Sequence, residues 1–235
     1  MKKYTSIDYP QKVIVIDNYC ENYEELCDNF PNLGCMNNDA RRASAFDKNF
    51  NYNKNIWMSF VEEHISKKYL EATCDLLEDH LIQWRPKLFE KIKSKNYTLG
   101  FRGDRNECDV VYDFKFGTGS DMQLNSKSTS TGKGTDVHVD FQNKIFQTMI
   151  YFPNFGDNGI GGDFHLTKLH QDGSFYDVVK CSYKSNRGII FPHHPSGWHF
   201  VTPRKSEFVR RGAAVIYTMR EDLQEISPEF FEQKI

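Results

Sequence analysis

The sequence predicts a mainly β (α+β) fold whose strands close into a double-stranded jelly-roll barrel. Short runs rich in β-branched and aromatic residues, ended by glycine or proline, fill the C-terminal half of the chain. A helical pattern fills much of the N-terminal half. Two histidine motifs far apart in the sequence hold residue types that suit one metal ion, and they can meet only if the sheet closes on itself.

The N-terminal part is expected to contain a strand, a short helix and a long loop. Lys12–Asp17 is an apolar, β-branched run that predicts a strand, and Asn22–Phe30 has the spacing of a short helix. Residues 35–55 are polar and rich in asparagine, so we expect a long loop there.

Residues 55–93 predict helices. Leu70, Cys74, Leu77 and Leu81 recur at spacings of four, three and four residues, which places them in one apolar stripe. Pro86 is expected to begin a new helical segment, because proline fits the first turn of a helix. The stripe is interpreted as core rather than as a cofactor site.

Four runs in the C-terminal half predict strands. They are Thr148–Phe152, Gly161–Leu166 with its glycine pair, Gly188–Pro192, and Val209–Thr218, which begins with two arginines. A polar loop before Trp198 is expected to carry the second histidine motif.

The two histidine motifs are His138-Val139-Asp140 and Trp198-His199. Two neutral imidazoles and one carboxylate occupy one face of an octahedral Fe(II) and leave the other positions open for a co-substrate and dioxygen. An arginine near that open face can hold a carboxylate through two parallel hydrogen bonds. His138, Asp140 and His199 are therefore the candidate metal ligands and catalytic residues.

Other histidines have weaker claims to be ligands. His170-Gln171-Asp172 repeats the triplet, but Asp172-Gly173 predicts an exposed hairpin turn. His193 and His194 precede His199, which has the better strand context, and His165 is expected to have a hydrogen-bonded structural role. His64 and His80 are expected to be surface or boundary residues of the helices.

The order of these motifs resembles the Fe(II)/2-oxoglutarate-dependent dioxygenases, in particular the prolyl-hydroxylase-like branch. The resemblance runs from about residue 108 to residue 218 and includes Gly161-Gly162-Asp163, Phe191-Pro192 and Trp198–Pro203. It implies a double-stranded β-helix (jelly-roll or cupin-like) barrel buttressed by the N-terminal helices.

The resemblance also implies roles for residues around the metal. Arg211 would hold the distal carboxylate of 2-oxoglutarate, with Ala213, Val215 and Tyr217 facing inward with it, while Arg210 would face outward. The alternative that Arg210 is the anchor stays open. Contacts to 2-oxoglutarate are expected from Thr148, Ile150 and Phe152, and Tyr151 or Gln123 is expected to supply the hydroxyl or amide that Phe152 lacks.

The reaction implied by the resemblance is hydroxylation of an unactivated C–H bond. It uses Fe(II), 2-oxoglutarate and O2, and it releases succinate and CO2. The intact Asp140 favours hydroxylation over halogenation. The substrate, a small molecule or a peptidyl side chain, is expected to be polar. A cupin-type metalloenzyme without 2-oxoglutarate and a non-catalytic jelly-roll binding module are the alternatives.

Composition limits the remaining classes of function. The chain has 235 residues, 39% hydrophobic residues and a net charge of −2, so we expect one domain over 1–235. Within it, 1–100 would hold the first strand and the helices, 101–220 the catalytic barrel and 221–235 a packing or dimer segment, so a homodimer is possible. The charge gives no general attraction to nucleic acid. The six cysteines contain no Cys-x-x-Cys pair, and no apolar run is long enough for a membrane span, so we expect a cytoplasmic protein.

Two segments allow more than one interpretation. Residues 126–136 contain Lys127 and Lys133 and no large apolar residue, which is typical of either a loop that closes over a site or a passive connection. Arg102 and Arg105 precede the expected barrel and lie either in a plain surface loop or within reach of an anionic substrate.

Overall fold

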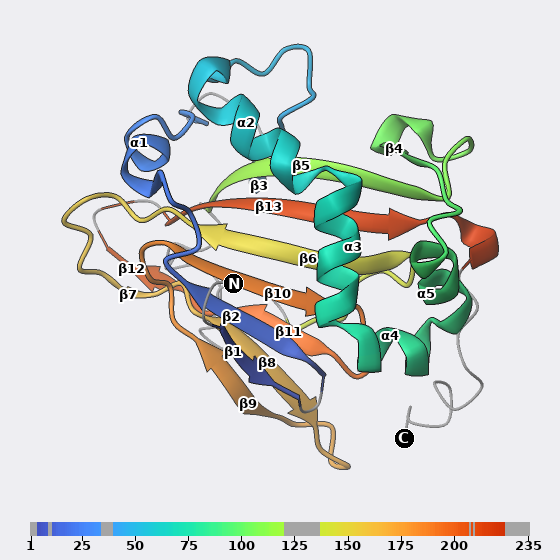
Figure 1. Cartoon of the computed structure of the whole chain (residues 1–235). Coiled ribbons are helices and arrows are strands. Elements are labelled where there is room, and N and C mark those ends of the chain that lie inside the picture. Colours follow the sequence, from blue (N-terminus) through green and yellow to red (C-terminus); the bar gives the residue numbers. More distant parts are fainter. Residues whose placement is uncertain are drawn as a thin grey trace.

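The computed structural model describes residues 4–8, 11–33, 40–119, 137–206, 208 and 210–223. These residues form three layers: helices, a large sheet in the middle, and a small sheet on the opposite side (Figure 1). The mainly β prediction with N-terminal helices is therefore confirmed for the part of the chain that the structure describes.

The large sheet contains eight strands. Its order is β1-β2-β10-β6-β13-β5-β3, with β4 paired to β5, and every pairing is antiparallel except that of β4 with β5. The strands are β1 (Tyr4–Ile7), β2 (Val13–Asp17), β3 (Ala40–Ser44), β4 (Leu99–Phe101), β5 (Val110–Gly119), β6 (Lys144–Tyr151), β10 (Arg187–Pro192) and β13 (Arg210–Met219).

Two smaller sheets complete the strands. One has the order β11-β8-β9 and the other pairs β12 with β7. Their strands are β7 (Ile160–Gly161), β8 (Phe164–Leu169), β9 (Phe175–Cys181), β11 (Trp198–Val201) and β12 (Arg204–Lys205). The turn between β8 and β9 holds exposed His170 and Gly173, the latter at a φ of 82°, so the hairpin expected there is confirmed.

The helices cover one face of the large sheet, where α2 and α3 cross the strands (Figure 1). The helical elements are α1 (Tyr23–Asp28), α2 (Lys54–His64), α3 (Lys67–Leu76), α4 (Glu78–Trp84), α5 (Pro86–Lys93) and the short 3-10 turns η1 (Arg102–Asp104) and η2 (Glu221–Leu223). Pro86 begins α5 as expected. The four residues of the predicted apolar stripe are fully buried, so this stripe is core.

The other face of the large sheet packs on the small three-stranded sheet. Tyr151, Ile189 and Phe191 from the large sheet form a second apolar cluster with Phe164 and Leu166 of β8. The described strands nevertheless form separate sheets and do not close into a barrel by strand pairing. The closed barrel of the prediction is therefore not confirmed.

Two local predictions are wrong. Within the expected loop 35–55, Ala40–Ser44 forms β3, which pairs with β5, because the edge of a long strand offers unpaired backbone groups. His64 and His80, expected at the surface or boundary of the helices, are both buried.

Two further predictions concern segments outside the described residues, namely 126–136 and, within the C-terminal segment, 224–235. No helix in the described part of the chain is long and apolar enough to cross a bilayer.

Candidate active site

His138 and His199 are brought together by the backbone. The His138 amide donates to the His199 carbonyl at 3.1 Å, and the His199 amide donates to the His138 carbonyl at 2.9 Å. This mutual pair places the two residues opposite each other, with ring centroids 4.4 Å apart. His199 sits on β11 because Trp198–Val201 pairs with β8 of the small sheet.

Asp140 completes a three-residue group with these histidines. One potential ligand atom from each of His138, Asp140 and His199 lies within 4.8 Å of the other two. Adjacent ligands of an octahedral ion with bonds of about 2.1 Å are about 3 Å apart, so a small contraction of the group would close it around an ion. Two imidazoles and a carboxylate with open positions opposite them suit Fe(II), although this donor set accepts other divalent metals.

A hydrogen bond selects the ligand atom of His199. Its Nδ1 donates to the Gly197 carbonyl at 2.8 Å, which leaves Nε2 without a proton, 3.8 Å from Asp140 Oδ2. Burial lowers the pKa of His199 to about 4, against the opposing effect of Asp140. The imidazole is therefore neutral near pH 7, as a metal ligand must be.

Lys144 is a site residue that the sequence interpretation missed. Its Nζ lies 2.6 Å from Asp140 Oδ1 and donates to Gln147 Oε1 at 2.8 Å. Burial by itself would raise the pKa of Asp140, but the positive charge of Lys144 and its hydrogen bond to the carboxylate contribute to an opposing effect that outweighs burial and lowers it. The available clue was a lysine at the head of a mostly apolar strand.

These residues open onto a cavity of about 790 Å³. It lies on the face of β5, β13 and β6 that is turned away from the helices, with β8 and β11 contributing Phe164 and His199. Phe164 and Phe191 lie beside the His199 ring, with centroids 5.5 and 5.4 Å from it. The remaining wall includes Met149, Tyr151, Val201, Arg210, Ala214 and Ile216.

The two arginines of β13 point in opposite directions, and their facing is the reverse of the prediction. Arg210 is buried, lines the cavity, donates from Nε to the Gly162 carbonyl at 3.0 Å and lies 4.7 Å from the Tyr151 ring centroid. Arg211 donates from Nε to the Phe152 carbonyl at 2.9 Å and lies 5.1 Å from the ring centroid of Phe30, among the residues that pack on the helices.

The reason for this reversal is the register of β13. Side chains alternate along the strand as expected, and Ala213, Val215 and Tyr217 share one face. That face packs on the helices, whereas it was expected to face the metal site. The Tyr217 hydroxyl donates to the carbonyl of His64 at the end of α2.

The expected co-substrate contacts divide in the same way along β6. Thr148 shares a 2.7 Å hydrogen bond with the Tyr69 hydroxyl of α3, and Phe152 stacks on Tyr23, so both lie on the helix face. Tyr151 lies on the cavity face beside Arg210. Ile150 belongs to the helix-side core and is also among the residues that line the cavity. Gln123 lies outside the described residues.

Four of the remaining histidines, His64, His80, His165 and His194, have structural contacts through their rings. The buried His64 bonds to the Tyr19 hydroxyl, and the buried His80 donates to the His193 carbonyl. His194 accepts from the Ser196 amide and packs on Trp84, and His165 donates to Asp177. Each of these rings therefore has a structural partner away from the three-residue group.

Comparisons with known proteins add little to this description. No family model matches the sequence, and no curated protein is similar to it in sequence. Among solved structures, IDO from Bacillus thuringiensis matches with 13% identity and a TM-score of 0.44, covering 89% of this chain and 93% of that chain. A Pseudomonas putida prolyl-4-hydroxylase matches with 16% identity and a TM-score of 0.28, covering 46% of this chain and 52% of that chain. These similarities are too low to assign a family.

Proposed function

We propose that this protein is a cytoplasmic Fe(II)- and 2-oxoglutarate-dependent dioxygenase that hydroxylates a C–H bond of a polar substrate. The observation that carries the proposal is that His138, Asp140 and His199 meet in the same cavity that Arg210 lines. In this proposal the two sheets correspond to the two halves of a jelly roll, and the three-residue group stands between them.

The three-residue group would hold the metal. His138 and His199 contribute imidazole nitrogens and Asp140 a carboxylate oxygen, and the Gly197 carbonyl fixes the orientation of His199. When bound, Fe(II) with 2-oxoglutarate and dioxygen supplies the oxidising power, with conversion of 2-oxoglutarate to succinate and CO2. Phe164 and Phe191 cover the His199 ring and keep water from that side of the site.

Arg210, in place of Arg211, would anchor the distal carboxylate of 2-oxoglutarate. A guanidinium binds a carboxylate through two parallel charge-assisted hydrogen bonds, and a buried one does so with little competition from water. The Tyr151 hydroxyl, on the same face of the sheet, is the second donor that we assign to this carboxylate. Thr148 and Phe152 are assigned to the helix-side core, with no contact to the co-substrate.

The experiment is an anaerobic titration of the iron-loaded protein with 2-oxoglutarate, followed through the visible charge-transfer band of the chelate. We expect the band in the wild type, none in His199→Ala, and at least tenfold weaker 2-oxoglutarate binding in Arg210→Lys, since losing a buried bidentate contact costs about 2 kcal/mol or more.

Two matched variants control this titration. Arg211→Lys and Thr148→Val alter the neighbouring positions on the helix face and should bind 2-oxoglutarate within twofold of the wild type. A larger loss in Arg211→Lys than in Arg210→Lys would return the anchor to Arg211. Absence of the band in folded, iron-loaded wild type would sink the proposal and favour a cupin-type metalloenzyme or a binding module.

A further inference from the structure

Three basic side chains line the cavity on the side away from Arg210. Arg102 belongs to η1, Arg105 follows in the next turn, and Lys115 projects from β5. We call these three residues the basic rim. All three line the same cavity as His138, Asp140 and His199.

A single buried carboxylate organises part of the basic rim. Asp113, with only 7% of its side chain exposed, accepts a hydrogen bond from Ser44 Oγ at 2.7 Å. Its Oδ2 lies 3.3 Å from Lys115 Nζ and 3.5 Å from Arg102 Nη1. Asp113 therefore holds two cations on the cavity side, while its one charge can neutralise only one of them.

A purely structural interpretation would treat these contacts as ion pairs that tie η1 to the sheet. That interpretation accounts for one cation beside Asp113, but among the described residues it leaves the second cation without a matching negative charge and gives Arg105 no role.

The charge of the whole cavity favours an anion. The described residues that line it include five Lys and Arg side chains but only Asp113 and Asp140 as acids, an excess of three positive charges. The full chain, by contrast, has a net charge of −2. Fe(II) and 2-oxoglutarate carry opposite and equal charges, so binding them leaves this excess in place.

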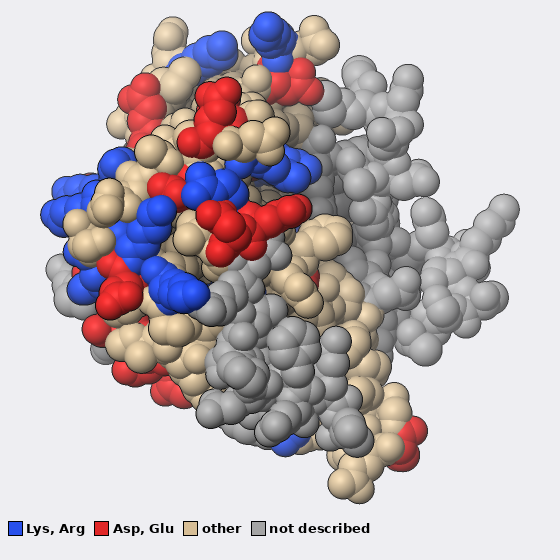
Figure 2. Space-filling model, turned by 90° about the vertical axis from the view of Figure 1, so that its right-hand side faces the viewer, with Lys and Arg blue, Asp and Glu red and all other residues tan. Residues whose placement is uncertain are grey.

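The outer surface on this side of the molecule carries charges of both signs. Figure 2 looks at the side that carries β4 and η1 in Figure 1, and Lys and Arg side chains are interspersed there with Asp and Glu. A surface with charges of both signs is expected for a chain with a net charge of −2. The excess of positive charge is therefore a property of the cavity and its rim.

The rim lies across the sheet from the candidate metal ligands. Asp113 pairs with Ile216, and Ile216 pairs with Gln147 on β6, so Asp113 and Gln147 are two strand spacings apart, roughly 10 Å. Gln147 contacts Lys144, which pairs with Asp140. Arg210 lies in a different direction, along β13, opposite Gly119.

We propose that the basic rim binds a carboxylate or phosphate group of a small anionic substrate. The role of the anion as a substrate rests on the proposed function. Anion binding itself is argued only from the residues that line the cavity and from their charges. The group would be held by Arg105 and Lys115, with Arg102 beside them. The atom to be oxidised would lie at the three-residue group, beyond the two strand spacings (roughly 10 Å) that separate Asp113 from Gln147. Arg210 remains assigned to 2-oxoglutarate.

The test measures binding of matched charged and uncharged probes by calorimetry. The protein is loaded with Mn(II) and saturating 2-oxoglutarate, so that Arg210 is occupied. The probes are glycerol 3-phosphate against glycerol, and 4-hydroxybutyrate against 1,4-butanediol. We expect at least one anion to bind tenfold or more tightly than its uncharged counterpart, and 1 M salt to weaken it. The tighter of the two anions identifies phosphate or carboxylate as the preferred group.

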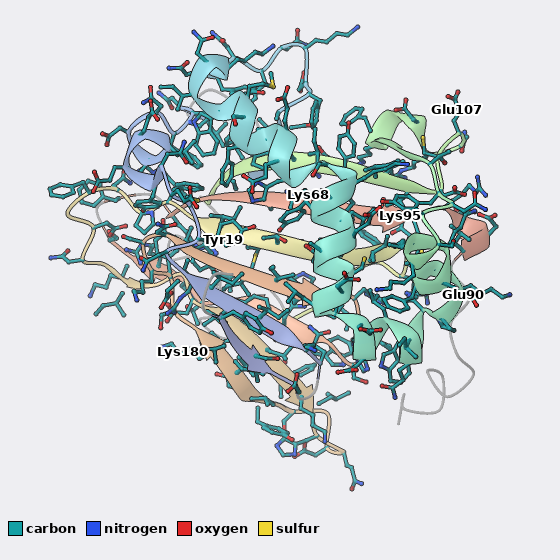
Figure 3. The ribbon with its side chains drawn as sticks, in the orientation of Figure 1. Tyr19, Lys68, Glu90, Lys95, Glu107 and Lys180 are labelled. Carbon is teal, nitrogen blue, oxygen red and sulfur yellow. The ribbon has the colours of Figure 1, made fainter. Side chains whose placement is uncertain are left out.

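Three variants locate the site. Arg105→Gln and Lys115→Met should each weaken the preferred anion at least fivefold, because each removes a cation from the rim. Lys68→Met is the matched control: Lys68 is exposed on α3, which packs against the opposite face of the large sheet, and its removal should leave anion binding unchanged (Figure 3). All three variants should bind Mn(II) and 2-oxoglutarate within twofold of the wild type.

The outcomes separate this inference from the proposed function. Equal binding of charged and uncharged probes, or equal loss in Lys68→Met and Lys115→Met, would overturn the basic rim even with an intact charge-transfer band. A missing band together with rim-dependent anion binding would overturn the dioxygenase and keep the anion site. A short single-stranded oligonucleotide that displaces the small anion, and does so at a lower concentration than the anion needs to bind, would overturn the small substrate. The rim would then be a nucleic-acid site.

Discussion

At the scale of single residues, the direction of one side chain decides which arginine belongs to the candidate site. Arg210 and Arg211 are adjacent and chemically identical, and strand alternation requires only that they point to opposite faces. The choice follows from the partners: the Gly162 carbonyl and Tyr151 for Arg210, and Phe152 and Cys27 for Arg211. Since those partners come from distant segments, neighbouring sequence could not reveal the choice.

Lys144→Met is expected to raise the affinity for a divalent metal about tenfold. Lys144 and a metal would share the Asp140 carboxylate, and two cations on one carboxylate repel by several kcal/mol at an effective dielectric constant near 20. Loss of a residue that orients a metal ligand lowers the metal affinity 10- to 100-fold. We expect this loss to be smaller than the gain from removing the repulsion between Lys144 and the metal. Anaerobic titration with Fe(II) or Mn(II) measures the change.

Lys68→Met again provides the control, because it removes an exposed charge from α3, which packs on the opposite face of the large sheet. A fall in metal affinity in Lys144→Met would mean that orientation of Asp140 outweighs repulsion. It would make Lys144 a positioning residue of the metal site.

At the scale of elements, the glycine pair at the end of β7 shapes the position of Arg210. Gly161 and Gly162 have φ angles of 86° and 78°, which only glycine adopts without strain. A Cβ on Gly161 would overlap the Pro203 carbonyl oxygen, and one on Gly162 would lie 3.1 Å from Arg210 Cδ. The pair therefore lets β12 and Arg210 approach the backbone closely.

Gly161→Ala should lower the free energy of unfolding by about 3 kcal/mol or more, because strain adds to the overlap with backbone. Gly173→Ala is the matched control: Gly173 has a φ of 82°, but a methyl group there would meet no atom within 4 Å, so only the strain of about 1 kcal/mol remains. Urea unfolding of both variants measures the difference. An equal decrease in the free energy of unfolding in the two variants would contradict the prediction. It would show that β7 and β12 can move apart without destabilising the protein.

At the scale of the whole molecule, buried histidines between the helices and the sheets couple stability to pH. Burial lowers the pKa of His80 and His193 to about 3 and that of His194 to about 4. The unfolded chain takes up protons at these residues below pH 6.5, whereas the folded chain does not, so stability falls as pH falls from about 6.5 towards 4.

Each of these histidines should remove roughly 1.4 kcal/mol of stability per pH unit within that window. Urea unfolding of the metal-free protein at pH 7, 6 and 5 tests this before most carboxylates titrate. His194→Gln keeps an acceptor for the Ser196 amide and removes one titrating group, so its stability should depend less steeply on pH. A wild-type stability that is unchanged from pH 7 to pH 5 would contradict the prediction.

The sequence by itself determined the mainly β class, the helices with their buried stripe, most C-terminal strands and the three residues that can share a metal. These depend on local periodicity and on residue chemistry, which the order of amino acids carries directly. Tertiary structure alone decided that Ala40–Ser44 adds a strand, that Thr148 and Phe152 face the helices, that Arg210 faces the cavity, and that Lys144 meets Asp140. The physical reason is that a strand has two faces and two edges, and only the layers packed against them determine which face is a core and which is a site.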